Sequence, residues 1–231
     1  MPSSEATLAS AVDKPSRRTQ QQRRDGTQRK LLDATLACLG ELGYARTTTT
    51  EIVRAAGVSQ GALFKHYPSK AGLLAAAVEH LFEEVVSGYE ATLAARPSGK
   101  TDPEAAFALL WSIYTGPRLT IAFELYVVAR TDPALQQSLE PVVRRHRALL
   151  VEHARALFPL AAEGNAEFAA WIDLLMCSME GLVIERFGAG DVTGPALLLL
   201  KRIWLDTLKR SEATAKRAKR ALGRASGESS R

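Results

Sequence analysis

Residues 47–70 read TTTTEIVRAAGVSQGALFKHYPSK, and this stretch decides the fold of the 231-residue chain. It predicts two short helices joined by a tight turn. Thr48 and Glu51 have the Ser/Thr-x-x-Glu spacing of a capping box, which marks the start of the first helix. Gly57 stands where the end of that helix requires a positive φ, and Ser59 stands where the second helix requires an N-cap hydroxyl.

The second short helix is predicted to run from Gln60 to about Tyr67, because Pro68 cannot continue it. Two such helices are typical of a helix-turn-helix, whose second helix enters the major groove of DNA. Downstream, Ser69 is placed to cap a long helix that begins at Lys70. Upstream, one apolar stripe at helical spacing predicts a supporting helix; its members are Leu31, Ala34, Thr35, Cys38, Leu39 and Leu42.

From Thr27 to Leu74 the chain resembles the DNA-binding domain of the TetR (tetracycline repressor) family of transcriptional regulators. Residues 123–147 are also similar to the ligand domains of some members. The resemblance implies an all-α protein, with an N-terminal three-helix helix-turn-helix domain and a C-terminal helical domain for ligand binding and dimerisation. The residues that carry it in the N-terminal part are Leu31-Leu32-Asp33-Ala34, Gly43-Tyr44, Thr48-Thr49, Glu51-Ile52, Ala56-Gly57-Val58-Ser59, Leu63 and His66-Tyr67-Pro68-Ser69-Lys70.

Composition supports an all-α fold, because helix formers dominate and no alternating β pattern persists. Four parts are predicted: a disordered basic arm over residues 1–24, the DNA-binding domain over 25–72, the ligand and dimerisation domain over 73–213, and a basic disordered tail over 214–231. Helices in the second domain are expected at about 70–95, 103–115, 117–131, 133–158, 165–187 and 194–213. Cys38 and Cys177 lie in apolar helical patterns and are predicted to be reduced core residues.

Charge is divided unevenly along the chain. Residues 1–75 carry 11 Lys/Arg against 6 Asp/Glu, whereas residues 76–208 carry 11 against 17 and residues 209–231 carry 8 against 2. A basic head on an acidic body favours nucleic-acid binding through the head. No apolar run is long enough to span a membrane and no signal peptide is recognisable, so a cytoplasmic protein without a membrane partner is expected.

DNA binding requires donors to phosphates and side chains that reach base edges. By the resemblance, Thr48, Thr49 and Lys70 are the phosphate contacts, and Thr50 is placed to reach a base. The side-chain amide of Gln60 could pair with adenine, and the ammonium group of Lys65 could pair with guanine. The full predicted set is Thr48, Thr49, Thr50, Ser59, Gln60, Gly61, Ala62, Phe64, Lys65, His66, Tyr67 and Lys70.

One position departs from the family pattern. The family usually has Tyr where this chain has Phe64, so the phosphate contact of that hydroxyl is lost and Phe64 is left with packing or sugar contacts. His66 has two interpretations, as an ordinary helix-end histidine or as a phosphate contact. The arginines of the N-terminal arm, Arg17, Arg18, Arg23 and Arg24, likewise belong either to a solvated tail or to an arm that reaches the minor groove.

The last two helical segments are apolar on almost every side, and together they carry more apolar surface than a monomer of this size readily buries. In the family such helices form a four-helix dimer interface. A twofold homodimer is therefore expected, with heads about 34–36 Å apart on a palindromic operator. The predicted interface residues are Trp171, Leu175, Leu182, Leu197, Leu200, Ile203 and Trp204.

A pocket for an unknown small-molecule effector is predicted inside the body, since such sites are apolar with a few polar anchors. Its residues could equally be ordinary core. The predicted lining is Trp111, Tyr114, Phe123, Tyr126, Met176 and Glu180, with Arg130 and His146 as further polar candidates. Effector binding would favour a head spacing unsuited to DNA. No cofactor and no metal site are predicted.

Three other functions compete with a repressor. An enzyme is disfavoured because HExxH, GxSxG and Walker motifs are missing. A DNA-coating protein without sequence preference would show affinity set by salt alone. A small-molecule sensor with a vestigial head would not require intact Thr49, Lys65 and Lys70. The expected function is thus a ligand-responsive regulator of transcription.

Overall fold

The computed structural model describes residues 20–94, 102–190 and 194–228, and these ranges form ten helices without a strand. The all-α prediction is confirmed. In chain order the helices are α1 (Gln20–Leu42), α2 (Thr49–Ala56), α3 (Gln60–His66), α4 (Lys70–Ala94), α5 (Pro103–Tyr114), α6 (Pro117–Ala129), α7 (Pro133–Leu157), α8 (Pro159–Glu163), α9 (Phe168–Ala189) and α10 (Gly194–Glu228).

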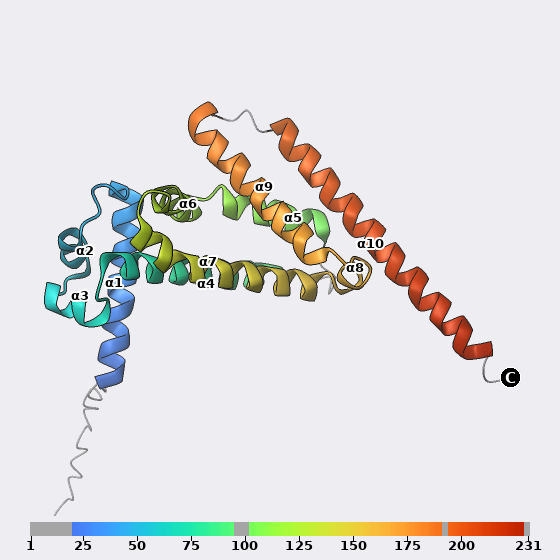
Figure 1. The fold of residues 1–231 in the computed structure, drawn as a ribbon, viewed down its shortest axis with the longest axis horizontal. Helices are drawn as coiled ribbons and strands as arrows, with labels where there is room; N and C mark the ends of the chain where they lie inside the picture. The colour runs from blue at the N-terminus through green and yellow to red at the C-terminus, as the bar shows by residue number, and fades with distance from the viewer. Residues whose placement is uncertain (1–19, 95–101, 191–193, 229–231) are drawn as a thin grey trace, which may run out of the picture.

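Helices α1, α2 and α3, with the first turn of α4, form the head at one end of the molecule (Figure 1). The head has its own hydrophobic core, in which the side chains of Leu31, Ile52 and Leu63 are completely buried. Leu73 at the start of α4 completes this core. Leu31, Ala34, Cys38 and Leu42 of the stripe read from the sequence belong to this core, whereas Leu39 packs in the main core of the body.

The turn between α2 and α3 has the predicted chemistry. The side-chain oxygen of Thr48 accepts a hydrogen bond from Glu51 N at 3.2 Å, and that of Ser59 accepts one from Ala62 N at 3.2 Å. Gly57 ends α2 with φ +64°, in the left-handed region that favours glycine. The carboxylate of Glu51 pairs with Arg54, three residues on, and only one half of the capping box is formed.

Helices α4 and α7 lie side by side and run in the same direction away from the head (Figure 1). The Glu79–Arg145 ion pair lies near the head. Further along, Phe82 stacks on His146 with ring centroids 3.8 Å apart. Each helix has 25 residues, a length of about 37 Å at 1.5 Å per residue, so the pair spans the body.

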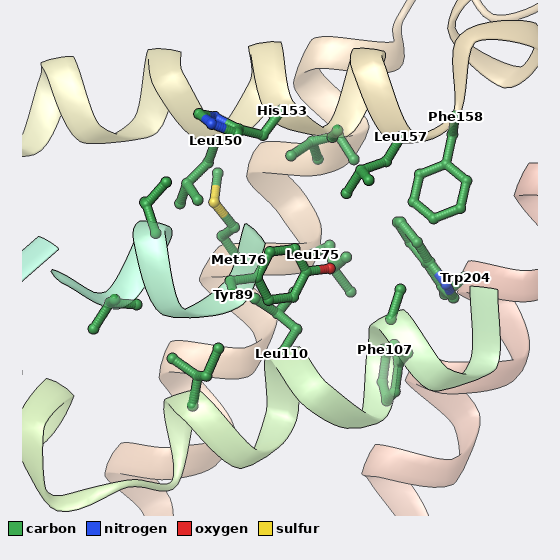
Figure 2. A pocket seen from close by; sticks show the side chains of 16 residues that line it. Tyr89, Phe107, Leu110, Leu150, His153, Leu157, Phe158, Leu175, Met176 and Trp204 are labelled. Atoms are coloured by element: carbon green, nitrogen blue, oxygen red, sulfur yellow. The ribbon is translucent and has the colours of Figure 1, made fainter. Parts of the chain in front are cut away.

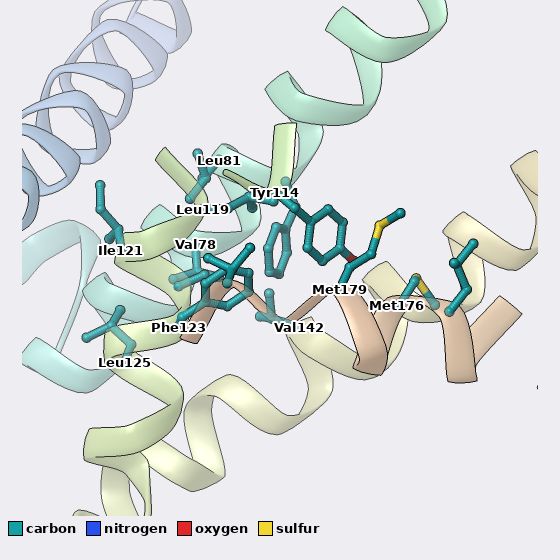
Figure 3. Close-up of a cluster of buried hydrophobic side chains, with 14 of the residues drawn as sticks. Val78, Leu81, Tyr114, Leu119, Ile121, Phe123, Leu125, Val142, Met176 and Met179 are labelled. Carbon is teal, nitrogen blue, oxygen red and sulfur yellow. The ribbon is translucent and has the colours of Figure 1, made fainter. Parts of the chain in front are cut away.

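Helices α5, α6 and α9 cover this pair and enclose the main core. Figure 3 shows Tyr114 and Phe123 inside this core, among aliphatic side chains that include Val78 and Leu125. Helix α10 packs on α8 at very close range, because a Cβ added to Gly164 would lie 1.8 Å from Ser211 O. The glycine at this position lets the two backbones meet.

Both ends of the described chain are more helical than expected. Residues 20–24 of the predicted disordered arm belong to α1, and residues 214–228 of the predicted tail belong to α10. These segments are polar and lack an apolar stripe, which is why they looked disordered. Their Gln, Arg, Lys and Ala residues are good helix formers, and Gln21 Nε2 donates to Asp25 Oδ1 at 2.8 Å. Arg17 and Arg18 lie outside the described residues.

The predicted body helices are present with small shifts at their ends, except that α10 continues to Glu228, and the short helix α8 was not foreseen. Cys38 is buried as expected, but Cys177 is exposed and its Sγ accepts a hydrogen bond from Arg147 at 3.3 Å. The apolar residues next to Cys177 in the sequence lie on both the buried and the exposed face of α9, so the apolar pattern did not show on which face Cys177 lies. Among the described residues, no helix has the length and apolarity required to cross a membrane.

Candidate DNA interface and body cavity

Helix α3 presents a polar face on the outside of the head. Leu63 anchors the helix in the head core, while Gln60, Gly61 and Lys65 are exposed on its outer side. Phe64 is 44% exposed on the same helix. Side chains suited to base edges and to the DNA backbone therefore project together from one short helix.

The hydroxyl residues at the helix starts surround α3. Thr48 and Ser59 accept hydrogen bonds from backbone N–H groups, so their own hydroxyl protons remain available to a phosphate. Thr50 is exposed. Gln60 Nε2 donates one hydrogen bond to Thr49 Oγ1 at 3.2 Å, which leaves its second N–H and its carbonyl oxygen available to a base edge.

The last turn of α3 is less accessible than its first. Tyr67 packs against the head core, and burial raises the pKa of its hydroxyl, which also bonds with Gln28. His66 is half-buried and its Nδ1 has no hydrogen-bond partner among the described residues. Ala62 is also half-buried. Of the predicted base-reading positions in α3, Gln60, Gly61 and Lys65 are the most exposed to solvent.

Lys70 lies where the head joins the body. Its Nζ is 4.4 Å from the centroid of the Tyr44 ring, a cation–π geometry. Burial lowers the pKa of Lys70, and the nearby carboxylate of Asp132 acts in the opposite direction. The predicted phosphate contact is thus partly enclosed by groups of the head and of the body.

A hydrophobic cavity of about 70 Å³ lies at the other end of α4 and α7. Figure 2 shows its walls, among them Tyr89, Leu110, Met176 and Trp204. His153 is polar, and its Nδ1 is 2.6 Å from Leu149 O while its Nε2 faces Glu90. The lining residues are Val85, Val86, Tyr89, Ala106, Phe107, Leu110, Ile113, Leu150, His153, Ala154, Leu157, Phe158, Ile172, Leu175, Met176 and Trp204.

Of the six residues predicted to line the pocket, Met176 is the one that lines this cavity. Tyr114 and Phe123 are core residues with ring centroids 6.1 Å apart. Glu180 pairs with Arg147 at 3.2 Å, and burial raises its pKa. The prediction chose aromatic and charged residues of α5, α6 and α9 by type. The cavity instead forms where α4, α5, α7, α9 and α10 meet. Of the other predicted residues, Trp111 packs against the core, Tyr126 and Arg130 border an open groove beside α7, and His146 stacks on Phe82.

Two residues predicted for the dimer interface are buried within the protomer. Leu175 and Trp204 both line the cavity. Ile203 is exposed as expected, whereas Trp171, Leu182, Leu197 and Leu200 are half-buried. The all-round apolar pattern could not show which face each helix presents. The strongly exposed apolar residues of α9 and α10 are Leu174, Ile184, Phe187, Leu198, Leu199, Ile203 and Leu222.

Three residues that were not among the predicted site residues join the head to the body. Tyr44 N donates to Glu124 Oε1 at 2.8 Å, and the Tyr44 hydroxyl donates to Asp132 Oδ2 at 2.9 Å. Asp132 had a recognisable role as the N-cap of α7, but no sequence pattern connects it with a residue 88 positions earlier. The side chains of Tyr89, Phe107 and Phe158 in the cavity wall belong to ordinary apolar stripes and carry no separate signal.

One group of side chains within the described ranges has the composition of a cation site. His80 Nε2 is 3.2 Å from Asp33 Oδ1 and 3.6 Å from Glu84 Oε1. Arg118 already neutralises Glu84 through an ion pair. These four side chains come from α1, α4 and α6, and they form a second polar contact between head and body.

Comparison with known proteins agrees with a DNA-binding role for the head. Residues 31–77 match the model of the bacterial regulatory proteins of the tetR family. An uncharacterised HTH-type transcriptional regulator of Mycobacterium tuberculosis is 32% identical over 169 residues, which cover 73% of this chain and 87% of that protein. The HTH-type transcriptional regulator CymR of Pseudomonas putida is 33% identical over 181 residues, covering 77% and 87%.

Solved structures share the fold. A transcriptional regulator from Saccharomonospora viridis, crystallised in complex with choline, superposes with a TM-score of 0.55 at 14% identity, over 80% of this chain and 96% of that one. At this identity the likeness concerns the fold alone. As a member of a family of transcriptional regulators, the protein is a DNA-binding helix-turn-helix regulator and not an enzyme. The match over the head, together with the relatives above 30% identity, shows that this chain belongs to the tetR family of bacterial regulatory proteins.

Proposed function

We propose that the protein is a homodimeric repressor, which binds a palindromic operator through α3 and leaves it when a small apolar molecule fills the body cavity. One observation carries the proposal. Helix α4 begins at Lys70, beside the DNA-reading helix, and its far part supplies Val85, Val86 and Tyr89 to the cavity wall. One continuous helix thus connects the site for DNA with the site for the effector.

The dimer part of the proposal is supported by the outer faces of α9 and α10. Phe187 is 61% exposed and Leu198 is 70% exposed, and further exposed leucine and isoleucine side chains lie on the same two helices. Several exposed apolar side chains on two helices favour a contact with another protein. A second copy of the chain, related by a twofold axis, would cover the surface and present two heads to successive major grooves.

The lining of the cavity indicates the chemistry of the effector. None of the described lining residues is a carboxylate, and the walls are aliphatic and aromatic. An uncharged apolar molecule therefore fits the site better than a cation, which would lose hydration without gaining a counter-ion. The Saccharomonospora viridis relative was crystallised with choline, a quaternary ammonium compound. We propose that the ligand of this chain is of a different class.

Release of DNA would follow from a shift of population between two head arrangements. A ligand that does not fit the cavity as it stands must push apart the walls contributed by α4 and α7. It would then favour any conformation in which these walls are already further apart. The effector changes DNA affinity only to the extent that it binds the two conformations differently.

Selection of bound sequences from a random duplex pool, at near-physiological salt, tests the proposal. An enriched palindrome is the expected result and would fix the spacing of the two heads. Binding without enrichment would indicate a DNA-coating protein whose affinity is set by salt. No binding at all, by a chain shown to be folded, would indicate a sensor whose head does not read DNA.

A further inference from the structure

The carboxylate of Asp132 lies at the junction of the head and the body. Its Oδ1 accepts a hydrogen bond from Leu135 N at 3.0 Å and caps α7. Its Oδ2 accepts a hydrogen bond from the Tyr44 hydroxyl at 2.9 Å. Each oxygen thus has a separate task, one within the body and one toward the head.

Tyr44 is held on two sides and in turn holds Lys70. Its backbone N–H donates to Glu124 Oε1 of α6 at 2.8 Å, which fixes the corner between α1 and α2 on the body. The face of its ring lies under the Lys70 ammonium group. Lys70 is the first residue of α4 and the predicted phosphate contact, so its position depends on Tyr44.

The charges at this junction are fixed at neutral pH. Hydrogen bonds from Leu135 N and then from the Tyr44 hydroxyl lower the pKa of Asp132, so its carboxylate is ionised. The Lys70 ammonium group lies over the ring of Tyr44 and the Asp132 carboxylate lies at the hydroxyl of the same side chain, so the two opposite charges are close together. Burial lowers the pKa of Lys70, while Asp132 raises it. A DNA phosphate that approaches Lys70 therefore meets an anion already in place.

The junction and the cavity occupy opposite ends of the same two helices. Asp132 caps α7 at the head, and the last turns of α7 supply Leu150, His153 and Leu157 to the cavity wall. Helix α4 has the same arrangement, from Lys70 to Tyr89. A relative shift of α4 and α7 at the cavity therefore changes the separation of Lys70 and Asp132 at the head.

We propose that Asp132 is a positioning residue that competes with DNA phosphate for Lys70, and that it reports the state of α7 to the DNA-binding head through Tyr44. The inference rests on the proposed function for the role of the effector, but the competition itself concerns only Lys70 and DNA. While the Tyr44–Asp132 hydrogen bond is closed, Lys70 is partly neutralised and the protein binds DNA less tightly than it otherwise would.

The variant Asp132→Asn isolates the charge. Asn is as good an N-cap as Asp, and its Oδ1 can accept from Leu135 N while its Nδ2 donates to the Tyr44 hydroxyl oxygen, so the contact is kept with its direction reversed and the fold is preserved. The matched control is Asp102→Asn, because Asp102 caps α5 in the same way, with Oδ1 accepting from Glu104 N at 3.1 Å, in a different helix. Thermal unfolding should be similar for the two variants.

A double-mutant cycle with Lys70→Ala provides the decisive measurement, by fluorescence anisotropy on the selected operator duplex at 100 mM salt. Asp132→Asn is expected to tighten binding about three-fold in the wild-type chain, as for a partly exposed ion pair, and to have no effect in the Lys70→Ala chain. The control Asp102→Asn should leave binding unchanged in both chains.

Unchanged affinity of Asp132→Asn in the wild-type chain would overturn the inference. Equal tightening with and without Lys70 would also overturn it, because Asp132 would then repel DNA directly without acting through Lys70. If selection finds no operator, the same cycle is run on a random-sequence duplex, since phosphate contacts do not depend on sequence. Failure of the proposed function therefore remains distinguishable from failure of the inference.

Discussion

The indole rings of Trp171 and Trp204 stack on each other, with centroids 4.7 Å apart and planes only 6° from parallel. Trp204 Nε1 also donates to Pro103 O at 3.2 Å, and Phe158 packs edge-on against the same ring at 5.4 Å. One side chain of α10 thus ties together α5, α9 and the start of α8 beside the cavity. This position explains why Trp204 is part of the protomer core.

Gln60 and Lys65 are expected to read base edges. Replacing either with Ala should relax sequence preference at one base pair per half-site, at a cost of about 1–3 kcal/mol. Comparison of binding profiles on single-base variants of the selected operator measures the effect. An unchanged base profile for both variants would remove them from the base-reading set and leave α3 as a shape reader.

Lys70→Ala should weaken binding to all duplexes alike, because a phosphate contact carries no sequence information. The slope of log affinity against log salt should become shallower by about one charge. Titrations at four salt concentrations, on operator and on random duplex, test this role. Loss of binding to the operator alone would contradict it.

The exposed apolar surface of α9 and α10 is expected to form the dimer contact. The double variant Leu198→Glu with Ile203→Glu should yield a monomer, since two buried charges per protomer would face the partner. Light scattering after gel filtration measures the mass. Val127→Glu is the control, because Val127 is 58% exposed but lies on α6. A double variant that remains dimeric would place the contact elsewhere.

Ala154 lines the cavity, and Ala154→Leu should fill it. The three added carbons contribute about 0.8 kcal/mol each when buried, about 2.4 kcal/mol together, and ordering the leucine side chain costs about 0.5–1 kcal/mol, so the free energy of unfolding should rise by about 1.5 kcal/mol. Millimolar toluene, as an apolar probe, should raise the unfolding temperature of the wild type more than that of this variant. The control Ala156→Leu alters an exposed position of the same helix. An equal response of the two variants to toluene would place the probe outside the cavity.

His146 should make the protein less stable in acid. Burial, with Arg147 and His153 nearby, lowers its pKa from 6.5 to about 4. Between these values the unfolded chain binds a proton that the folded chain does not. Stability from this group is therefore complete above pH 6.5 and is lost as the pH falls toward 4. The loss amounts to about 3 kcal/mol at most, at about 1.4 kcal/mol per pKa unit.

Urea unfolding at pH 7 and pH 4.5 measures this contribution of His146. His146→Phe keeps the stacking on Phe82 and removes the titration, so its stability should fall less over the same pH interval. A loss of equal size in the variant and in the wild type would assign the acid sensitivity to other groups.

The sequence was sufficient for the head because the head is built from local rules. Caps at Thr48 and Ser59, the positive φ of Gly57 and the stripe on α1 act over a few residues, and each one is present in the structure. The family resemblance added the direction in which α3 faces. The predicted helices of the body were accurate for the same reason, since Pro and Asp mark their starts at Asp102 and Asp132.

The cavity could not be predicted, because its position depends on how five helices pack. Phe107, His153 and Phe158 come from three separate segments, and nothing in their neighbourhoods distinguishes a cavity wall from a filled core. The orientation of α9 and α10 posed the same problem: a helix that is apolar all round does not reveal which face the protomer uses. The contact between Tyr44 and Asp132 spans 88 residues and is a tertiary property.

The tryptophan pair gives the molecule a built-in optical reporter. The chain contains three tryptophans, Trp111, Trp171 and Trp204, and none of them belongs to the head. Trp204 lines the cavity, and its excited state is sensitive to any ligand that displaces the stacked ring of Trp171. Emission from the native protein should therefore change when the cavity is occupied and be largely insensitive to direct contacts between α3 and DNA. The two binding events can be followed separately in one unlabelled sample.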